Sequence, residues 1–269
     1  MRFTVRRAGM PRFRHPATPT RTRDRRRAGA CGQRRAATVT VMTDTTVLIT
    51  GAAGGLGNAV TREFLASDWR VVAAVRPGAA GRLAQGAEPV EADLDDPTAV
   101  AEVARVAAAD PAAPLRALVN LVGGFAAGGR VHETPITEFE AIIARNLRPT
   151  YLVTAAALPH LVAAGGGSVV CVSSRAAQHP FPGAAGYVAA KAAVLAFAGA
   201  VAVEYAADRV RCNTVLPGMI DTPANRAAMP EADTSTWVDP AKIARVIRFL
   251  AGPDSGPVTG AAIPVDAAI

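Results

Sequence analysis

Half of the 269 residues are apolar and only 5% are aromatic, so Ala, Val, Leu and Ile must build the core. This content excludes a disordered protein, and three cysteines without a C-x-x-C pair exclude a disulfide framework and predict no metal site. The cysteine usage fits a reducing compartment, and the longest apolar run, residues 192–203, is too short to span a bilayer. We therefore expect a cytoplasmic protein without a membrane partner.

The net charge of +7 is concentrated at one end of the chain. Residues 1–41 hold 12 Arg and one acid, Asp24, whereas the remainder holds 17 basic and 21 acidic residues. The first segment has no helical or strand period and contains three prolines, which predicts a disordered basic tail or extension. A transit-type presequence and an arm for nucleic acid or anionic membrane are the alternatives. The mildly acidic remainder indicates no nucleic-acid partner.

Residues 42–269 alternate short β-rich runs with longer helical runs and are predicted to form one domain. The predicted strands are 46–50, 70–75, 88–92, 117–122, 168–173, 209–215 and 262–265. The predicted helices are 55–67, 97–109, 138–163, 186–206 and 240–251. Strands this apolar are buried on both faces, which favours parallel pairing. The pattern predicts an α/β fold: a single doubly wound Rossmann-type domain, with a mostly parallel seven-stranded sheet and helices on both faces.

Three of the predicted helices begin with recognisable capping residues. Asp96 and Asp239 each precede a proline that suits the first helical position. Thr137 and Glu140 have the spacing of a capping box, which predicts that they open the helix 138–163.

A glycine-rich segment, TGAAGGLG at residues 50–57, follows the first strand and opens the first helix. Glycines allow the backbone to approach a pyrophosphate, and the helix N-terminus offers free N–H groups and a positive dipole end. A plain turn is the alternative. The candidate cofactor-binding residues here are Gly51, Gly54, Gly55, Leu56 and Gly57.

The end of the second strand indicates which dinucleotide is used. An NAD site usually has an acid there for the ribose hydroxyls, but this strand ends Val75-Arg76-Pro77. Arg76 is suited to pair with a 2′-phosphate, although a solvated surface arginine is the alternative. We expect NADP (NADPH) to be preferred, with NAD as the second possibility.

Tyr187 and Lys191 are four residues apart on a predicted helix and therefore share a face. A free phenol has a pKa near ~10, and a neighbouring ammonium is expected to lower that value toward working pH. Ser173 and Ser174 end the fifth strand, where a doubly wound sheet opens its ligand crevice. These groups are candidates for acid–base chemistry, whereas a packed tyrosine with an exposed lysine is the alternative.

The glycine spacing T-G-x-x-x-G-x-G and the Tyr187-x-x-x-Lys191 pair resemble the short-chain dehydrogenase/reductase family across residues 46–265. The resemblance implies a catalytic serine thirteen residues before the tyrosine, which selects Ser174 rather than Ser173. It also implies that Asn146 is the fourth catalytic residue and anchors a water leading to Lys191. Pro149 would kink the helix beside it.

Further cofactor contacts follow from the same resemblance. Asp93 and Leu94 match the adenine side of the family's site, and Asn120 and Gly123 match the segment beside the ribose. The residues that match the nicotinamide side are Pro217, Gly218, Ile220 and Thr222. Two departures stand out: the usual N-N-A-G reads Asn120-Leu121-Val122-Gly123 here, and the last strand lacks its usual glycine pair.

Residues 221–233 with Trp237, and residues 123–129, resemble the lid and neighbouring segment of dihydropteridine reductases. Trp237, Phe125 and Phe181 either line a flat apolar pocket or pack the lid. We expect an NAD(P)-dependent oxidoreductase, most simply an NADPH-dependent reductase of a ketone or ketoacyl carbonyl. Reduction of a pterin C=N system and a non-enzymatic binding role on this fold are the alternatives.

The helices 138–163 and 186–206 are apolar over more of their circumference than one core face requires. Such helices must be buried by the sheet or by another subunit. The resemblance implies that they pair across a two-fold axis, so we expect a homodimer or homotetramer that acts on a small-molecule carbonyl substrate.

Overall fold

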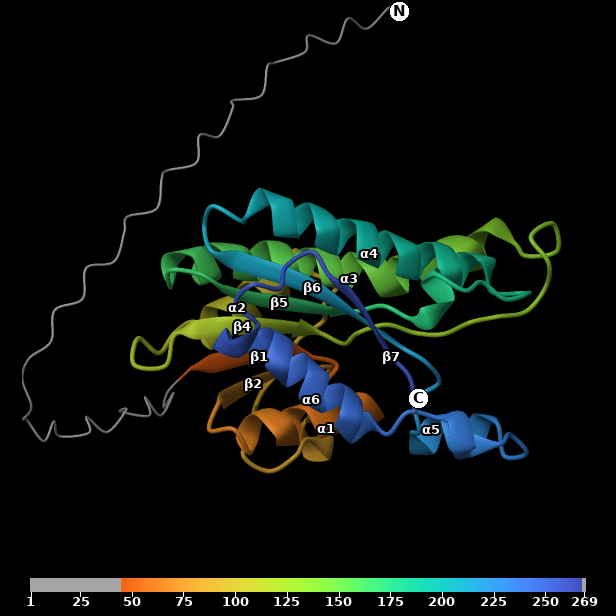
Figure 1. Cartoon of the computed structure of the whole chain (residues 1–269), viewed down its shortest axis with the longest axis horizontal. Helices are drawn as coiled ribbons and strands as arrows, with labels where there is room; N and C mark the ends of the chain where they lie inside the picture. Colours follow the sequence, from red (N-terminus) through yellow and green to blue (C-terminus); the bar gives the residue numbers. More distant parts are fainter. Residues whose placement is uncertain (1–44, 268–269) are drawn as a thin grey trace, which may run out of the picture. The chain divides into compact units, whose positions relative to one another are not determined.

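Seven parallel strands form one sheet in the order β3-β2-β1-β4-β5-β6-β7 (Figure 1). The computed structural model describes residues 45–267, so the predicted tail 1–41 lies outside the described residues. The strands are β1 (Thr46–Thr50), β2 (Arg70–Val75), β3 (Glu88–Glu91), β4 (Leu115–Asn120), β5 (Gly167–Val172), β6 (Val210–Pro217) and β7 (Ala262–Val265). The doubly wound α/β fold is confirmed, and every strand pair is parallel.

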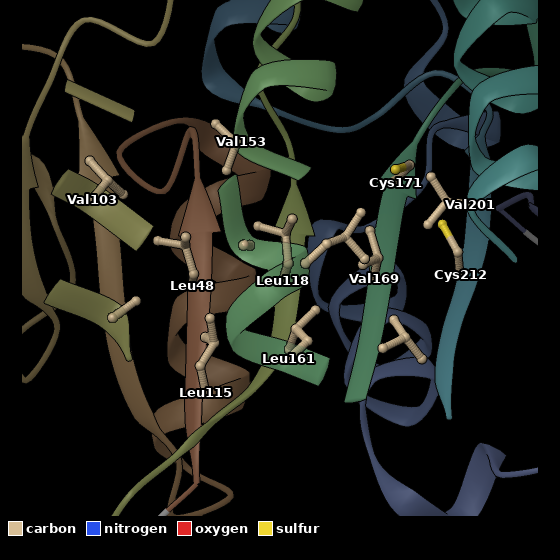
Figure 2. Packing of buried hydrophobic residues seen from close by; sticks show 14 of the residues in the cluster. Leu48, Val103, Leu115, Leu118, Val153, Leu161, Val169, Cys171, Val201 and Cys212 are labelled. Atoms are coloured by element: carbon tan, nitrogen blue, oxygen red, sulfur yellow. The ribbon is translucent and has the colours of Figure 1, made fainter. Parts of the chain in front are cut away.

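Helices cover both faces of the sheet (Figure 1). They are α1 (Gly55–Leu65), α2 (Pro97–Ala107), α3 (Ile136–Ala163), α4 (Ala185–Glu204), α5 (Pro223–Ala228) and α6 (Pro240–Ala251). Alternate side chains of β1 enter different cores, because successive residues of a strand point to opposite faces. Leu48 packs in the core beneath α2, α3 and α4 (Figure 2), whereas Val47 and Ile49 pack in the core beneath α1 and α6.

The helix starts agree with the sequence in two cases of three. Asp96 accepts a hydrogen bond from Thr98 N–H, and Asp239 accepts one from Ala241 N–H, as N-caps. The predicted capping box of α3 is wrong. This helix begins at Ile136, because the Pro135 carbonyl accepts the N–H groups of residues 138 and 139, which places Thr137 inside the first turn.

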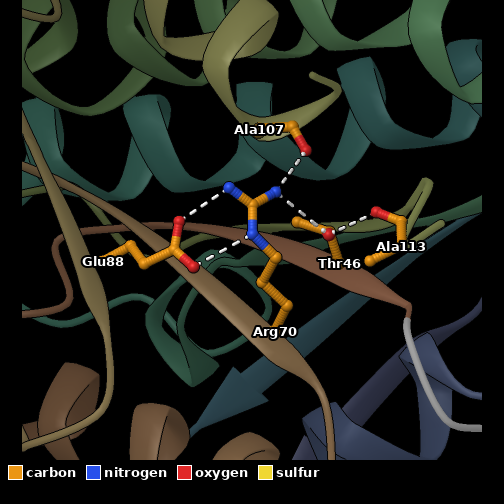
Figure 3. Close-up of polar contacts among 5 residues, drawn as sticks. All are labelled: Thr46, Arg70, Glu88, Ala107 and Ala113. Carbon is orange, nitrogen blue, oxygen red and sulfur yellow. Dashed lines mark hydrogen bonds and ion pairs between the residues drawn. The ribbon is translucent and has the colours of Figure 1, made fainter. Parts of the chain in front are cut away.

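An ion pair joins the amino end of β2 to that of its neighbour, the edge strand β3 (Figure 3). Arg70 on β2 donates to both carboxylate oxygens of Glu88 on β3, over 3.0 and 2.6 Å. Its remaining terminal nitrogen donates to Thr46 Oγ1 and to the Ala107 carbonyl, each over 3.4 Å. This network lies at the amino ends of the strands, whereas the glycine loop and Ser174 follow carboxyl ends. Its role is therefore structural.

α4 has the length and the apolar composition of a membrane-crossing helix. Here it packs against α3 and β6, and its buried residues include Val194, Ala198 and Val201 from the core. It also contains the buried Lys191. A third of its most apolar stretch is buried within the structure.

Candidate functional site

The carboxyl ends of β1, β4, β5 and β6 lie at one edge of the sheet because all four strands are parallel. In the sheet, β2 and β3 lie on one side of β1, and β4 to β7 lie on its other side. Ligands of doubly wound sheets bind at such a switch point. The predicted glycine loop, Ser174 and the segment from Pro217 to Thr222 all follow strands that end there.

The glycine loop has the backbone that a phosphate site requires. Gly51 has a φ of +69°, and a Cβ on Gly57 would lie 2.1 Å from the Gly51 carbonyl oxygen, so neither position accommodates a side chain. Gly54 is the N-cap of α1 and offers no side-chain cap, and Gly54 and Gly55 are exposed while Leu56 is half-buried. The first N–H groups of α1 are therefore available to an anion, which fits a dinucleotide pyrophosphate.

The segment after β6 lies against this loop. A Cβ on Gly55 would be 2.8 Å from Thr222 Cγ2, so Thr222 sits directly over the glycine loop. The Thr222 hydroxyl accepts the Asn225 N–H and caps α5, a helix that the sequence did not predict. Gly218 N–H donates to the Val265 carbonyl, and Ile220 bridges to Val238. The structure thus brings together the two segments predicted to bind the cofactor.

Arg76 and Asp93 follow the neighbouring strands β2 and β3, whose pairing ends with Val75 opposite Glu91. Both side chains are exposed, and the following Leu94 is half-buried. Asp93 accepts the Asp95 N–H in a local turn. Among residues 45–267, no hydrogen bond or ion pair engages the Arg76 guanidinium, so it is available to a ligand.

Asn120 is placed differently from the expected cofactor contact. Its side chain is 3% exposed and donates to Thr154 Oγ1 on α3 over 2.9 Å. Its Oδ1 has no hydrogen-bond partner among the described residues. Since the side chain lies in the interior between β4 and α3, only the backbone of Asn120 is placed to reach a cofactor.

Ser173 and Ser174 have separate roles in the structure. The buried Ser173 hydroxyl donates to the Lys191 carbonyl over 2.8 Å and so ties β5 to α4. The Ser174 hydroxyl accepts the Ala176 N–H and lies beside the Tyr187 phenol. Burial raises the pKa of Tyr187, and a hydrogen bond with Ser174 lowers it by a smaller amount. The choice of Ser174 over Ser173 agrees with this geometry.

Lys191 is almost fully buried, and its Nζ donates to the Val172 carbonyl over 3.1 Å. Burial lowers the pKa of Lys191 to about 8. Its Nζ lies 5.9 Å from the centroid of the Tyr187 ring. In this structure burial is the largest influence on the Tyr187 pKa, and the Lys191 ammonium is directed at a backbone carbonyl, so the expected lowering of that pKa by Lys191 stays a prediction.

Asn146 is fully buried on α3 and holds the segment that follows β4. Its Nδ2 donates to the carbonyls of Gly124 and Ile142, each over 2.9 Å, and its Oδ1 accepts the Gly124 N–H over 3.2 Å. Both N–H groups of the Asn146 amide are thereby used as donors, while one lone pair of its Oδ1 can still accept a hydrogen bond.

Gly123 fits between two of the predicted catalytic residues. A Cβ at this position would be 2.6 Å from Asn146 Oδ1 and 3.1 Å from Lys191 Nζ. The chain departs from the family's N-N-A-G at Leu121 and Val122 but keeps the glycine at position 123, where a side chain would disturb the site. Asn146, Lys191 and Gly123 form one packed group.

A cavity of about 340 Å³ opens beside Tyr187. Phe125 meets the Tyr187 ring edge-on at 5.1 Å between centroids, and Phe181 lies 6.3 Å from Phe125. Trp237 is only 9% exposed, so its side chain is packed in the interior, whereas Phe125 and Phe181 are 61% and 44% exposed. None of the three lines this cavity, although Phe125 directly precedes its lining residue Ala126.

The contribution of α3 to this cavity was not predicted from the sequence. Glu138, Phe139 and Ile142 line it. A signal was present, because residues 138, 142 and 146 recur every four positions and so share one helical face with the predicted Asn146.

Comparison with known proteins agrees with this geometry. A family model described as short chain dehydrogenase matches residues 45–233. The chain belongs to the short-chain dehydrogenase/reductase family. It is 34% identical over 247 residues to 2-(R)-hydroxypropyl-CoM dehydrogenase of Xanthobacter autotrophicus, a match that covers 82% of this chain and 96% of the relative. It is 30% identical over 235 residues to a 3-oxoacyl-acyl-carrier-protein reductase of Thermotoga maritima, covering 81% and 95%.

Solved structures of the family share the fold. A short-chain type dehydrogenase/reductase from Mycobacterium ulcerans superposes with a TM-score of 0.78 at 26% identity, over 84% of this chain and 89% of that one. ElxO with NADP bound gives 0.76 at 27% identity, and a 3-ketoacyl-acyl-carrier-protein reductase from Brucella melitensis with NADH gives 0.73 at 26%. Each of these two covers 84% of this chain and 98% of the other. This short-chain dehydrogenase/reductase is therefore an NAD(P)-dependent oxidoreductase of hydroxyl or carbonyl groups.

Proposed function

We propose that the chain is an NADPH-dependent reductase of a ketone or ketoacyl carbonyl, with Ser174, Tyr187, Lys191 and Asn146 at the reaction centre. The observation that carries the proposal is the position of Tyr187. Its side chain lines an apolar cavity, the Ser174 hydroxyl lies beside its phenol, and Lys191 is buried behind its ring. Carbonyl reduction needs a hydrogen-bond donor and a proton donor at one oxygen, and this pair of hydroxyls supplies both.

Tyr187 carries the proton that carbonyl reduction needs. A phenol keeps its proton at neutral pH, and burial, which raises the pKa of Tyr187, holds it in that form until the transfer. When bound, the nicotinamide supplies the hydride that reduces the carbonyl carbon. Ser174 donates a hydrogen bond to the carbonyl oxygen, and Tyr187 transfers its proton to that oxygen to give an alcohol.

Lys191 and Asn146 support the return of a proton to Tyr187. With a pKa of about 8, the Lys191 ammonium is charged at neutral pH and stabilises the phenolate that the transfer leaves. The free lone pair of Asn146 Oδ1 is close to Lys191, since both atoms surround Gly123. A water held there would connect Lys191 to the solvent.

The choice of NADPH rests on Arg76. The residue is exposed, follows β2 and has no carboxylate partner among the described residues, so its charge is available to a 2′-phosphate. No acidic residue follows β2 directly to bind the ribose hydroxyls of NAD instead.

We propose that two copies associate through α3 and α4. Ile143, Leu147, Tyr151 and Phe197 line a shallow apolar groove along these helices, and Tyr151 is 55% exposed. The same helices carry Asn146, Tyr187 and Lys191, so a second copy would brace the reaction centre. A homodimer through this groove, or a homotetramer built from two of them, satisfies the exposed apolar surface.

A turnover screen tests the activity. Purified protein with NADPH should reduce ketones or ketoacyl thioesters and leave quinonoid dihydropterin unreduced. The Tyr187→Phe variant should lose most of its turnover of the ketones and thioesters. Turnover of the dihydropterin alone would contradict the proposed substrate.

A further inference from the structure

Three segments bound the cavity beside Tyr187. They are the uncharged glycine-rich stretch 126–129, residues 183–186, and the first two turns of α3, from which Glu138 lines the cavity. Its volume of about 340 Å³ is within the range of sites that hold small molecules. This inference rests on the proposed function, since it concerns the part of the substrate that extends away from Tyr187.

Large apolar side chains are exposed around this cavity. Val131 is 76% exposed and Ile136 is 65% exposed, and both line it. Phe125 and Phe181 are 61% and 44% exposed and pack together beside Tyr187, although they do not line the cavity. Exposed apolar side chains gathered in this way mark binding sites.

Glu138 is the only charged side chain that lines the cavity. It is exposed, and within residues 45–267 its carboxylate has neither a hydrogen-bond donor nor an ion-pair partner. An unneutralised carboxylate repels an anionic group brought beside it. The lining therefore favours apolar groups and selects against anions.

We infer that the part of the substrate in this cavity is an uncharged apolar arm, and that Glu138 disfavours analogues that carry an anionic group on that arm. The carbonyl lies at Ser174 and Tyr187, and the arm extends past Phe125 between Val131 and Ile136. Phe125 is a specificity-determining residue in this arrangement because its ring packs on Tyr187 and it directly precedes Ala126, which lines the cavity.

Two aromatic ketones of the same skeleton test this directly. With NADPH, kcat/KM for 4-methylacetophenone should exceed that for 4-acetylbenzoate by roughly tenfold or more, which corresponds to about 1.4 kcal/mol. Glu138→Gln should raise kcat/KM for the carboxylate ketone and so narrow its ratio to the neutral one, whereas Glu138→Lys should reverse the preference. Glu140→Gln is the matched control, because Glu140 is exposed on the same helix but does not line the cavity.

Binding separates this inference from the proposed activity. If neither ketone is reduced, the proposed function fails, but ligand-observed NMR with both ketones still measures occupancy of the cavity. Preferential binding of the neutral ketone, abolished by Glu138→Gln and not by Glu140→Gln, supports the inference. Equal binding of the two, binding of neither, or an identical effect of the two glutamine variants overturns it.

Phe125→Ala tests the apolar arm. The variant should lose roughly tenfold in kcat/KM for 4-methylacetophenone and little for acetone, whose methyl groups do not reach the opening. An equal loss for both ketones would show that Phe125 only supports Tyr187 and would overturn its assignment to specificity.

Discussion

Asn146 and Gly124 are joined by two hydrogen bonds: Nδ2 donates to the Gly124 carbonyl over 2.9 Å, and the Gly124 N–H donates to Oδ1 over 3.2 Å. Because both backbone groups of Gly124 are held, the adjoining residues are fixed as well. Gly123 lies against Lys191, and Phe125 meets the Tyr187 ring. One buried amide on α3 thus sets the positions of groups around both Tyr187 and Lys191.

The space at Gly123 gives the first prediction. In Gly123→Ala the new methyl group would lie 2.6 Å from Asn146 Oδ1 and 3.1 Å from Lys191 Nζ, so one of these groups must move. We expect turnover to fall at least about tenfold and the free energy of unfolding to fall by about 1–3 kcal/mol. Steady-state kinetics and urea unfolding measure both. Gly81→Ala is the control, since nothing lies within 4 Å of its Cβ position, and an equal effect of the two variants would refute the crowding argument.

The charge of Lys191 can be observed directly, because the chain contains only one other lysine, Lys242. NMR of protein labelled with 13C at lysine Cε should show one signal titrating near pH 8, and Lys242→Ala should leave that signal in place. The unfolded state binds this proton up to the ordinary pKa near 10.5, so it holds more protons than the folded state between about pH 8 and 10.5. The contribution of Lys191 to stability therefore rises with pH across that window. A midpoint at the ordinary value would refute the effect of burial.

Arg76 is expected to select the cofactor. Arg76→Asp should replace a preference for NADPH with one for NADH, because it removes a charge pair and adds repulsion toward the 2′-phosphate. The ratio of kcat/KM for the two cofactors is the measurement. Arg245→Asp, at an exposed position on α6, controls for the change in net charge. Wild-type protein that uses NADH as well as NADPH would show that Arg76 is only a surface residue.

The proposed subunit contact can be tested on α4. Ala196 is exposed beside Phe197, which lines the apolar groove shared with α3. Ala196→Glu should convert a dimer or tetramer to a monomer at micromolar concentration, because it would bury a charge in the contact. Light scattering reports the mass, and turnover should fall with it. A fully active wild-type monomer would contradict the proposed contact and its support of the site.

The fold was predictable because the strands and helices differ in period and in composition. All seven strands were expected within a few residues of their bounds, and Asp96 and Asp239 marked two helix starts by their own chemistry. α5 was missed, because six residues show too little periodicity to be distinguished from a loop. The start of α3 was misplaced, since the backbone carbonyl of Pro135 accepts the first helical bonds and no side-chain signature records it.

The site was predictable where it depends on spacing. Ser174, Tyr187 and the glycine loop follow from motifs, and the structure brings them to one edge of the sheet. The directions in which the side chains point could not be predicted from the motifs. Asn120 points into the interior toward Thr154, and Lys191 points to the Val172 carbonyl, because burial and local partners decide these directions.

The central claim is that Tyr187 donates the proton, and the turnover of Tyr187→Phe tests it most directly. The substitution removes one hydroxyl beside Ser174 and keeps the ring that contacts Phe125, so cofactor binding should be retained. Tyr205→Phe, at the end of α4, is the matched control. Our account predicts a fall in kcat of about 10²–10⁴-fold for Tyr187→Phe, with NADPH affinity almost unchanged. Turnover close to that of the Tyr205→Phe control would contradict it.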